Sequence, residues 1–154
     1  MAMTTDLERA LRLATDPPGG VSIEALQGLT LDDPSTWWDI ATTAEHLGVT
    51  AHTLRYYERI ELVDVPRDRA GHRRYDARAI RRLVFITRMR TAGMPISDLQ
   101  HYLLLVDAGP QTVSERLDLM LEHRDTLRRR IGELQLALAA TEYKIATYAE
   151  GPTP

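Results

Sequence analysis

The sequence contains no cysteine, and this absence removes several kinds of chemistry at once. Disulfide bonds, thiolate metal sites, iron–sulfur clusters and redox-sensing or catalytic thiols are all excluded. No apolar run approaches the roughly 18 residues that a membrane span needs. The N-terminus is acidic where a secretory signal peptide requires basic and then apolar residues. We therefore expect a cytoplasmic protein without membrane association, of one domain plus an extension.

Basic residues are slightly fewer than acidic residues overall but are concentrated in one stretch. The chain has 154 residues, of which 19 are basic and 22 acidic, and its net charge is −3. Residues 50–90 contain 11 arginines and five acids, so this stretch carries +6 and the rest of the chain −9. A basic segment between acidic flanks is typical of a surface that binds a polyanion.

Patterns typical of catalysis or metal binding are missing from the sequence. The five histidines have no close metal-ligand spacing, and Glu45-His46 lacks the second histidine of a zinc-binding helix. There is no serine, histidine and aspartate order, no phosphate-binding glycine loop and no carboxylate pair in a pocket-like context. We expect neither an enzyme nor a protein with a cofactor or a bound metal.

Residues 1–36 are predicted to be an extension with a short helix and a loop. Thr5 and Glu8 fit a capping box for a helix over residues 4–14, which the breakers at 16–20 end. We find no chemistry in this segment. It is predicted to be a flexible or packing appendage.

Two short helices are predicted from Asp39 onward. Asp39 has the position of an N-cap, and Gly48 ends the first helix. Thr50 caps the second helix, on which Leu54 and Tyr57 share a core-facing side. Such a pair is a helix-turn-helix pattern, which by itself is weak evidence because many helical domains contain it.

A small basic hairpin follows, and we call residues 62–75 the wing. Val63 and Val65 have strand character, and Gly71 marks the turn before the returning segment. The basic side chains of the wing are Arg67, Arg69, His72, Arg73 and Arg74. A basic hairpin after a helix-turn-helix predicts a winged DNA-binding domain over residues 37–107, with the second helix in the major groove.

Two more helices complete this domain. Asp76 is predicted to cap a helix that reaches about residue 89. Ser97 and Gln100 fit a capping box for a helix that reaches about residue 106.

The last helix is predicted over residues 111–148, where Thr112 and Glu115 fit a capping box, and a tail follows at 149–154. At 1.5 Å per residue it would be roughly 54 Å long, more than the width of a small domain. Eleven positions recur at alternating steps of four and three, and Arg124 and Thr141 occupy two of them. The other nine are apolar: Val113, Leu117, Met120, Leu127, Ile131, Leu134, Leu138, Ile145 and Tyr148. A monomer would expose this seam, so we expect a dimeric coiled coil rather than an intramolecular helical hairpin.

The string Thr53-Leu54-Arg55-Tyr56-Tyr57-Glu58 resembles the recognition helix of the mercury-resistance-regulator (MerR) family of bacterial transcription regulators. The resemblance continues through the wing, with Gly71, Arg73 and Tyr75, and covers about residues 38–148. It implies a mainly α fold, with a winged helix-turn-helix head and a homodimer joined by an antiparallel coiled coil. It also implies binding to double-stranded promoter DNA, which is distorted so that RNA polymerase can use it.

The resemblance places DNA contacts on both parts of the head. On the recognition helix they are Thr50, His52, Thr53, Arg55 and Tyr56. On the wing the matched contacts are Arg73 and Tyr75, to which the basic pattern adds Arg67, Arg69 and His72. Tyr57 is predicted to be a core residue, and Glu58 a local partner for arginine.

The C-terminal half is similar to the subgroup that responds to aldehydes or nitrosative stress, but that subgroup senses through a cysteine. Arg88 stands at the matching position, so thiol sensing is excluded. Three sources of regulation stay open: a small-molecule effector, protein abundance, or a partner or second protomer bound by residues 1–36. Candidates for an effector pocket, by location only, are Met94, His101, Tyr102, His123 and Tyr143.

Two other classes of function compete with a promoter-specific regulator. One is a coiled-coil adaptor whose head no longer binds DNA, and the other is an architectural DNA-binding protein with little sequence preference. The arginine density of residues 50–90 argues against the adaptor. Selectivity and salt dependence of DNA binding separate the other two.

Overall fold

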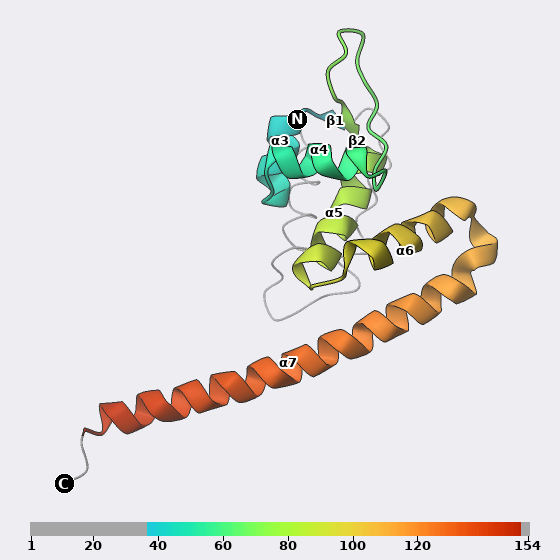
Figure 1. Ribbon diagram of the computed structural model, residues 1–154. Coiled ribbons are helices and arrows are strands. Elements are labelled where there is room, and N and C mark those ends of the chain that lie inside the picture. The colour runs from blue at the N-terminus through green and yellow to red at the C-terminus, as the bar shows by residue number, and fades with distance from the viewer. Residues whose placement is uncertain (1–36, 152–154) are drawn as a thin grey trace. The chain divides into compact units, whose positions relative to one another are not determined.

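The computed structural model describes residues 37–151, which form a mainly helical fold that ends in one long helix (Figure 1). The extension at 1–36, with its predicted helix, lies outside the described residues, as does most of the tail. The chain divides into two units, one ending at Leu99 and one beginning at Gln100. The predicted fold class, a winged helix-turn-helix head with a long C-terminal helix, is confirmed.

The helix-turn-helix consists of α3 (Ile40–Leu47) and α4 (Ala51–Arg59). The Asp39 carboxylate accepts the Thr42 N–H at 2.7 Å, and this hydrogen bond lowers the pKa of Asp39. Gly48 ends α3 in the left-handed region, at a φ of 66°. The Thr50 hydroxyl then accepts the Thr53 N–H at 3.1 Å, so both predicted N-caps are confirmed.

A single core fills the head. It includes Leu54 and Tyr57 from α4 together with one side of α5 (Ala77–Thr91). Its fully buried large side chains are Leu54, Leu62, Tyr75, Ile80, Leu83, Ile86 and Leu99. The core-facing role predicted for Tyr57 is confirmed, because only 6% of this residue is exposed.

The strand pairing of the head differs from the prediction. Strand β2 (Tyr75–Asp76) pairs antiparallel with β1 (Trp37–Trp38), with Trp38 opposite Tyr75. Val63 and Val65 are buried but lie in irregular backbone, so their predicted strand character is wrong. The Leu62 carbonyl accepts a hydrogen bond from the Nε–H of the Arg82 side chain at 2.6 Å. In a strand, a backbone N–H would be the donor.

The wing is nevertheless a hairpin, the long loop that rises beyond α4 in Figure 1. Arg67 and Arg73 form an isolated antiparallel bridge. The Asp68 N–H donates to the His72 carbonyl at 2.9 Å, and the Arg74 N–H donates to the Pro66 carbonyl at 2.8 Å. These bonds hold the basic hairpin that the sequence predicts.

Capping patterns located the later helices with two errors. Asp76 caps α5 by accepting the Ala79 N–H at 2.8 Å, as predicted. Helix α6 runs over Ile96–Ala108, so Ser97 lies inside the helix and the capping box predicted there is wrong. After the short 3-10 helix η1 (Pro110–Thr112), Thr112 precedes α7 but makes no side-chain cap. The predicted Thr112 capping box is therefore wrong, because this hydroxyl donates to the Leu105 and Gly109 carbonyls instead.

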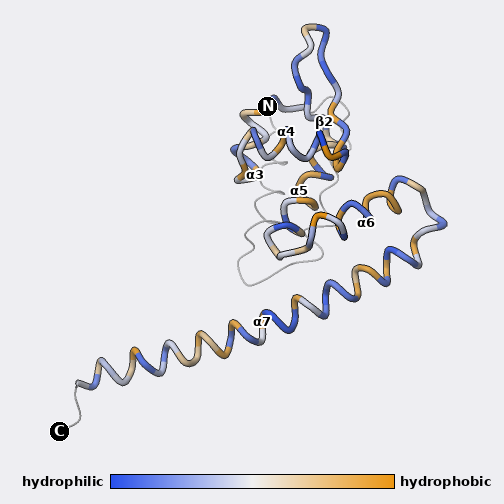
Figure 2. Tube along the Cα trace, viewed as in Figure 1, coloured by the Kyte–Doolittle hydropathy of each residue, from blue (hydrophilic) through white to orange (hydrophobic). Residues whose placement is uncertain are grey.

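Helix α7 spans Val113–Ala149, 37 residues, and none of them is fully buried. Apolar and polar residues alternate along its whole length (Figure 2). Leu134, Ile145 and Tyr148, from the predicted seam, are 67%, 62% and 75% exposed. Across residues 37–151, none of the helices combines the length and the apolar character that crossing a bilayer requires.

Candidate nucleic-acid interface

Helix α4 separates its core side from its polar side. Leu54 and Tyr57 lie in the core, whereas His52, Arg55 and Tyr56 are exposed. Residues three and four apart share one face of a helix, so these three side chains form one exposed surface. The structure thus brings together three of the five contacts predicted on this helix.

Thr50 and Thr53, the other two predicted contacts, lie at the first turn of α4. Their hydroxyls are 3.0 Å apart and share a hydrogen bond, while the Thr50 hydroxyl also caps the helix. Both hydroxyls therefore have a structural role at the helix N-terminus. Because backbone N–H groups and the helix dipole favour anions at such an end, a phosphate contact here agrees with their position.

Glu58 joins α4 to both strands of the wing. Its Oε1 accepts Nη2 of Arg67 at 2.9 Å, and its Oε2 accepts Nε of Arg73 at 2.6 Å. The prediction that Glu58 is a partner for arginine is confirmed by these two bonds. Each guanidinium has five N–H donors, and each gives only one to Glu58 in these bonds. The carboxylate thus positions two cations beside α4 while most of their donors remain for other acceptors.

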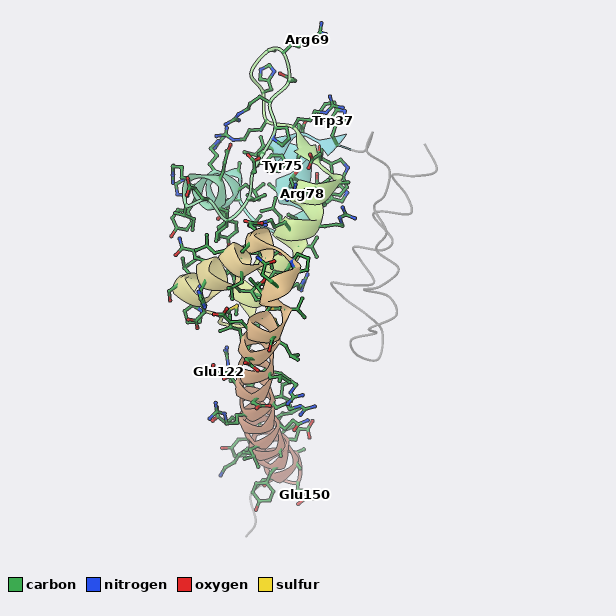
Figure 3. All side chains as sticks on the ribbon, turned by 90° about the vertical axis from the view of Figure 1, so that its right-hand side faces the viewer. Trp37, Arg69, Tyr75, Arg78, Glu122 and Glu150 are labelled. Carbon is green, nitrogen blue, oxygen red and sulfur yellow. The ribbon has the colours of Figure 1, made fainter. Side chains whose placement is uncertain are left out.

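The tip of the wing is organised by Asp68. Its Oδ1 accepts the backbone N–H groups of Ala70 and His72, both at 2.9 Å. The bond from the His72 N–H is the main cause of a lowered Asp68 pKa. Arg69 stands at the end of the wing (Figure 3), and the exposed His72 ring lies 3.5 Å from Asp68. The Asp68 carboxylate thus fixes the turn at the tip of the wing, where Arg69 and His72 lie.

Tyr75 differs from the other predicted wing contacts, because it is fully buried below the wing (Figure 3). Its hydroxyl has no hydrogen-bond partner in the structure and no exposure. Burial raises the pKa of Tyr75, and the nearby charges of Arg73, Arg67 and Arg55 offset part of the rise. The predicted phosphate contact is therefore not available to the hydroxyl as it lies here, and it requires the covering side chains to move.

Sequence reasoning missed Trp37 and Arg74 as neighbours. The Arg74 guanidinium lies 4.8 Å from the centre of the Trp37 ring, in cation–π geometry. Trp37 is 45% exposed and comes from β1, a strand that the sequence did not predict. The alternation of side chains along the returning segment of the wing would have placed Arg74 opposite Arg73.

Two of the predicted effector residues, His123 and Tyr143, lie far apart on α7. Met94 is buried in the first unit. In the second unit, His101 is exposed and lies 3.8 Å from Glu115, Tyr102 is half-buried, and the Nε2 atom of His123 is buried without a partner. Tyr143 is 70% exposed and lies 20 residues beyond His123, roughly 30 Å along α7. Tyr143 therefore cannot line a site with His123 unless another protomer supplies it.

Comparisons with known proteins agree with this geometry. The family model described as MerR HTH family regulatory protein matches residues 39–105, and that described as MerR, DNA binding matches residues 80–140. An uncharacterized HTH-type transcriptional regulator of Haemophilus influenzae is 32% identical over 109 residues, which cover 70% of this chain and 81% of that protein. The HTH-type transcriptional regulator AdhR of Bacillus subtilis is 41% identical over 90 residues, 58% of this chain and 64% of AdhR.

Solved structures show the same likeness. The crystal structure of HiNmlR, a MerR family regulator lacking the sensor domain, bound to promoter DNA, matches with a TM-score of 0.70 and 30% identity. The match covers 74% of this chain and 87% of that chain. The chain belongs to the MerR family and is a DNA-binding transcription regulator. Both relatives are transcription regulators by name.

Proposed function

We propose that two copies of this chain bind one promoter as a homodimer and distort its DNA to control access of RNA polymerase. The exposed apolar seam of α7 carries the dimer part of the proposal. Leu134, Ile145 and Tyr148 expose well over half of their surface, and such a continuous stripe on a long helix is covered in a coiled coil. An antiparallel coiled coil gives the two-fold symmetry that a palindromic operator requires.

Each protomer contributes one recognition helix and one wing. We assign base contacts to the exposed face of α4, with Arg55 reading guanine through its two parallel donors. We assign phosphate contacts to the first turn of α4 and to the wing, where Glu58 holds Arg67 and Arg73 beside the helix. Tyr75 joins this set only when the side chains that cover its hydroxyl move on DNA binding.

DNA shape would connect binding to transcription. A dimer with two fixed recognition helices accepts only DNA whose two half-sites are brought to its own spacing. RNA polymerase then responds to the altered promoter, with no direct contact needed. The protein acts in the cytoplasm, at the nucleoid, and a small-molecule effector is one source of regulation.

Selection of random double-stranded DNA by the purified protein tests this function. The expected result is an enriched two-fold-symmetric site, whose half-site spacing shows how much the DNA is bent or untwisted when both half-sites are bound. Binding without enrichment, fading only with salt, would replace the regulator by an architectural DNA-binding protein. No binding even at low salt would favour a coiled-coil adaptor and overturn the proposal.

A further inference from the structure

The wing presents two different basic faces. Arg73 turns toward α4, where Glu58 binds its Nε atom at 2.6 Å. Arg74, the next residue, turns to the opposite side and stacks on Trp37. Successive side chains of an extended strand point to opposite faces, which explains the separation. We call the pair of Trp37 and Arg74 the outer patch.

The outer patch combines a cation with an exposed aromatic ring at the edge of the head (Figure 3). Trp37 retains 45% of its surface, although it packs against Arg74. The Arg74 backbone N–H is bound to the Pro66 carbonyl at 2.8 Å, so the residue has a fixed place at the base of the wing. Such a patch suits an acidic segment that also carries apolar side chains.

The chain itself supplies such a segment. Residues 1–36 contain six acids and two arginines, and residues 13–36 contain four acids and no basic residue. These four are Asp16, Glu24, Asp32 and Asp33. Leu26, Leu29 and Leu31 lie among them. The charge of this segment is opposite to that of the wing.

Chain connectivity limits how far these acids can be from the outer patch. Asp33 precedes Trp37 by four residues, and four fully extended residues span at most roughly 14 Å. The Arg74 guanidinium lies 4.8 Å from the Trp37 ring. Covalent attachment over so short a distance gives an effective concentration on the order of millimolar. Such a tether favours a carboxylate of the same chain over one in free solution as a partner for Arg74.

We propose that residues 13–36, the acidic arm, dock on the outer patch of the same head and weaken DNA binding. The carboxylates of Asp32 and Asp33 pair with Arg74, and the arm places further negative charge beside the wing. DNA phosphates and the arm then compete for one positive field, so the arm lowers affinity for all DNA and most strongly for non-specific DNA. This inference rests on the wing being part of the DNA-binding surface.

The first test uses the full chain with Asp16→Asn, Glu24→Gln, Asp32→Asn and Asp33→Asn together. We expect its affinity for a non-specific duplex at low salt to rise about three- to tenfold, as one or two exposed ion pairs would give. The gain should vanish near 0.5 M salt, where the Debye length is roughly 4 Å. Fluorescence anisotropy of a labelled duplex measures both affinities.

A matched control changes the net charge equally at four exposed acids of α7, with Asp118→Asn, Glu122→Gln, Glu133→Gln and Glu142→Gln. If this control binds DNA as tightly as the arm variant, the effect belongs to total charge and the arm proposal fails. The arm variant is also combined with Arg74→Gln. We expect its gain to fall below about twofold in that background, because the docking partner is absent. An undiminished gain would remove Arg74 from the proposal.

A second test needs no DNA and so separates this proposal from the proposed function. The Nε–H resonance of Arg74 should shift between the wild-type protein and the arm variant in nuclear magnetic resonance spectra. Arg73 is the internal control, because Glu58 already binds its Nε atom. Equal Arg74 spectra in both proteins would overturn the docking. A third outcome would assign the outer patch to DNA. In that case the Arg74 Nε–H resonance is the same in the wild-type protein and the arm variant, and Arg74→Gln lowers DNA affinity as much as Arg69→Gln does.

Discussion

The DNA-binding head and helix α7 reach their folds in opposite ways. In the head, Leu54 and Tyr75 are fully buried, and helices, wing and strands share one core. In α7, none of 37 residues is fully buried, and seam residues such as Leu134 expose more than half of their surface. The head thus completes its core within one chain, whereas α7 presents an apolar face with nothing of its own to cover it.

This difference indicates where each part gains its stability. Burial of apolar surface stabilises the head by about 25 cal/mol per Å² without a partner. In proteins, packing of an apolar face supplies most of the stability of a helix, and intrinsic helix propensity supplies less. Dimerisation should therefore stabilise α7 strongly and the head weakly. Substitutions in the seam of α7 should change the oligomeric state, whereas substitutions in the head should change DNA affinity or the free energy of unfolding.

The largest effect is expected from a charge in the seam of α7. Leu134→Glu would place a carboxylate between two helices, which costs several kcal/mol when no cation pairs with it. We expect the dimer to dissociate at micromolar concentration, and light scattering to report half the mass.

Leu136→Glu is the matched control for the seam. Leu136 is 75% exposed and lies only two residues from Leu134, on another side of the helix and outside the seam. The same chemical change at this position should leave the mass unchanged. If both variants or neither dissociate, the seam is assigned to the wrong residues.

The next largest effect concerns base recognition by the head. Arg55 is exposed on α4, beside Tyr56. Arg55→Ala should lower specific DNA affinity by about 1–3 kcal/mol, the value of a bidentate contact with guanine, and change non-specific affinity less. Titrations of the selected operator and of a scrambled duplex measure the two losses.

Arg128→Ala serves as the control for Arg55, because Arg128 is an exposed arginine of α7. It removes the same charge and should leave the ratio of specific to non-specific affinity unchanged. If Arg55→Ala lowers the affinity for both duplexes equally, Arg55 does not read a base and is a phosphate contact instead.

A smaller effect should follow from the link between α4 and the wing. Glu58 is 20% exposed and binds Arg67 and Arg73 at 2.9 and 2.6 Å. Glu58→Gln removes the charge from both bonds, and we expect the free energy of unfolding to fall by about 1–2 kcal/mol. Arg73→Gln should add little in the Glu58→Gln background, because the shared interaction is already weakened.

Urea unfolding at one fixed protein concentration measures this loss. Glu45→Gln is the control, since Glu45 is an exposed carboxylate of α3 in the same head. Full additivity of the Glu58 and Arg73 losses would show that the pair does not couple α4 to the wing.

Local patterns allowed much of this fold to be predicted from the sequence. The caps at Asp39, Thr50 and Asp76 depend on residues three positions away, and the structure has all three. The long helix and its apolar seam also follow from periodicity along one segment. The sequence predicted that Glu58 binds an arginine, but not that its partners are Arg67 and Arg73.

Pairings between distant segments could not be predicted in the same way. Strand β1 has two residues, too few for an alternating pattern, and its partner Tyr75 lies 37 positions after Trp38. Val63 and Val65 alternate like strand residues, yet their backbone is irregular, and the neighbouring Leu62 carbonyl binds the Arg82 side chain. The stack of Arg74 on Trp37 depends on this unpredicted pairing.

The smallest effect is expected from Tyr75→Phe, which tests whether the buried Tyr75 hydroxyl contacts DNA. Tyr75→Phe keeps the ring in the core and removes a hydroxyl that has no partner in the structure. Stability should stay equal or rise by up to about 1 kcal/mol, because an unsatisfied buried polar group is lost. If a DNA phosphate accepts a hydrogen bond from the hydroxyl, the variant should bind specific DNA about three- to fivefold more weakly. This loss is smaller than a full charge-assisted hydrogen bond would give, because uncovering the hydroxyl offsets part of the gain. Unchanged affinity with raised stability would make Tyr75 a core residue alone and leave the wing contacts to its arginines and histidine.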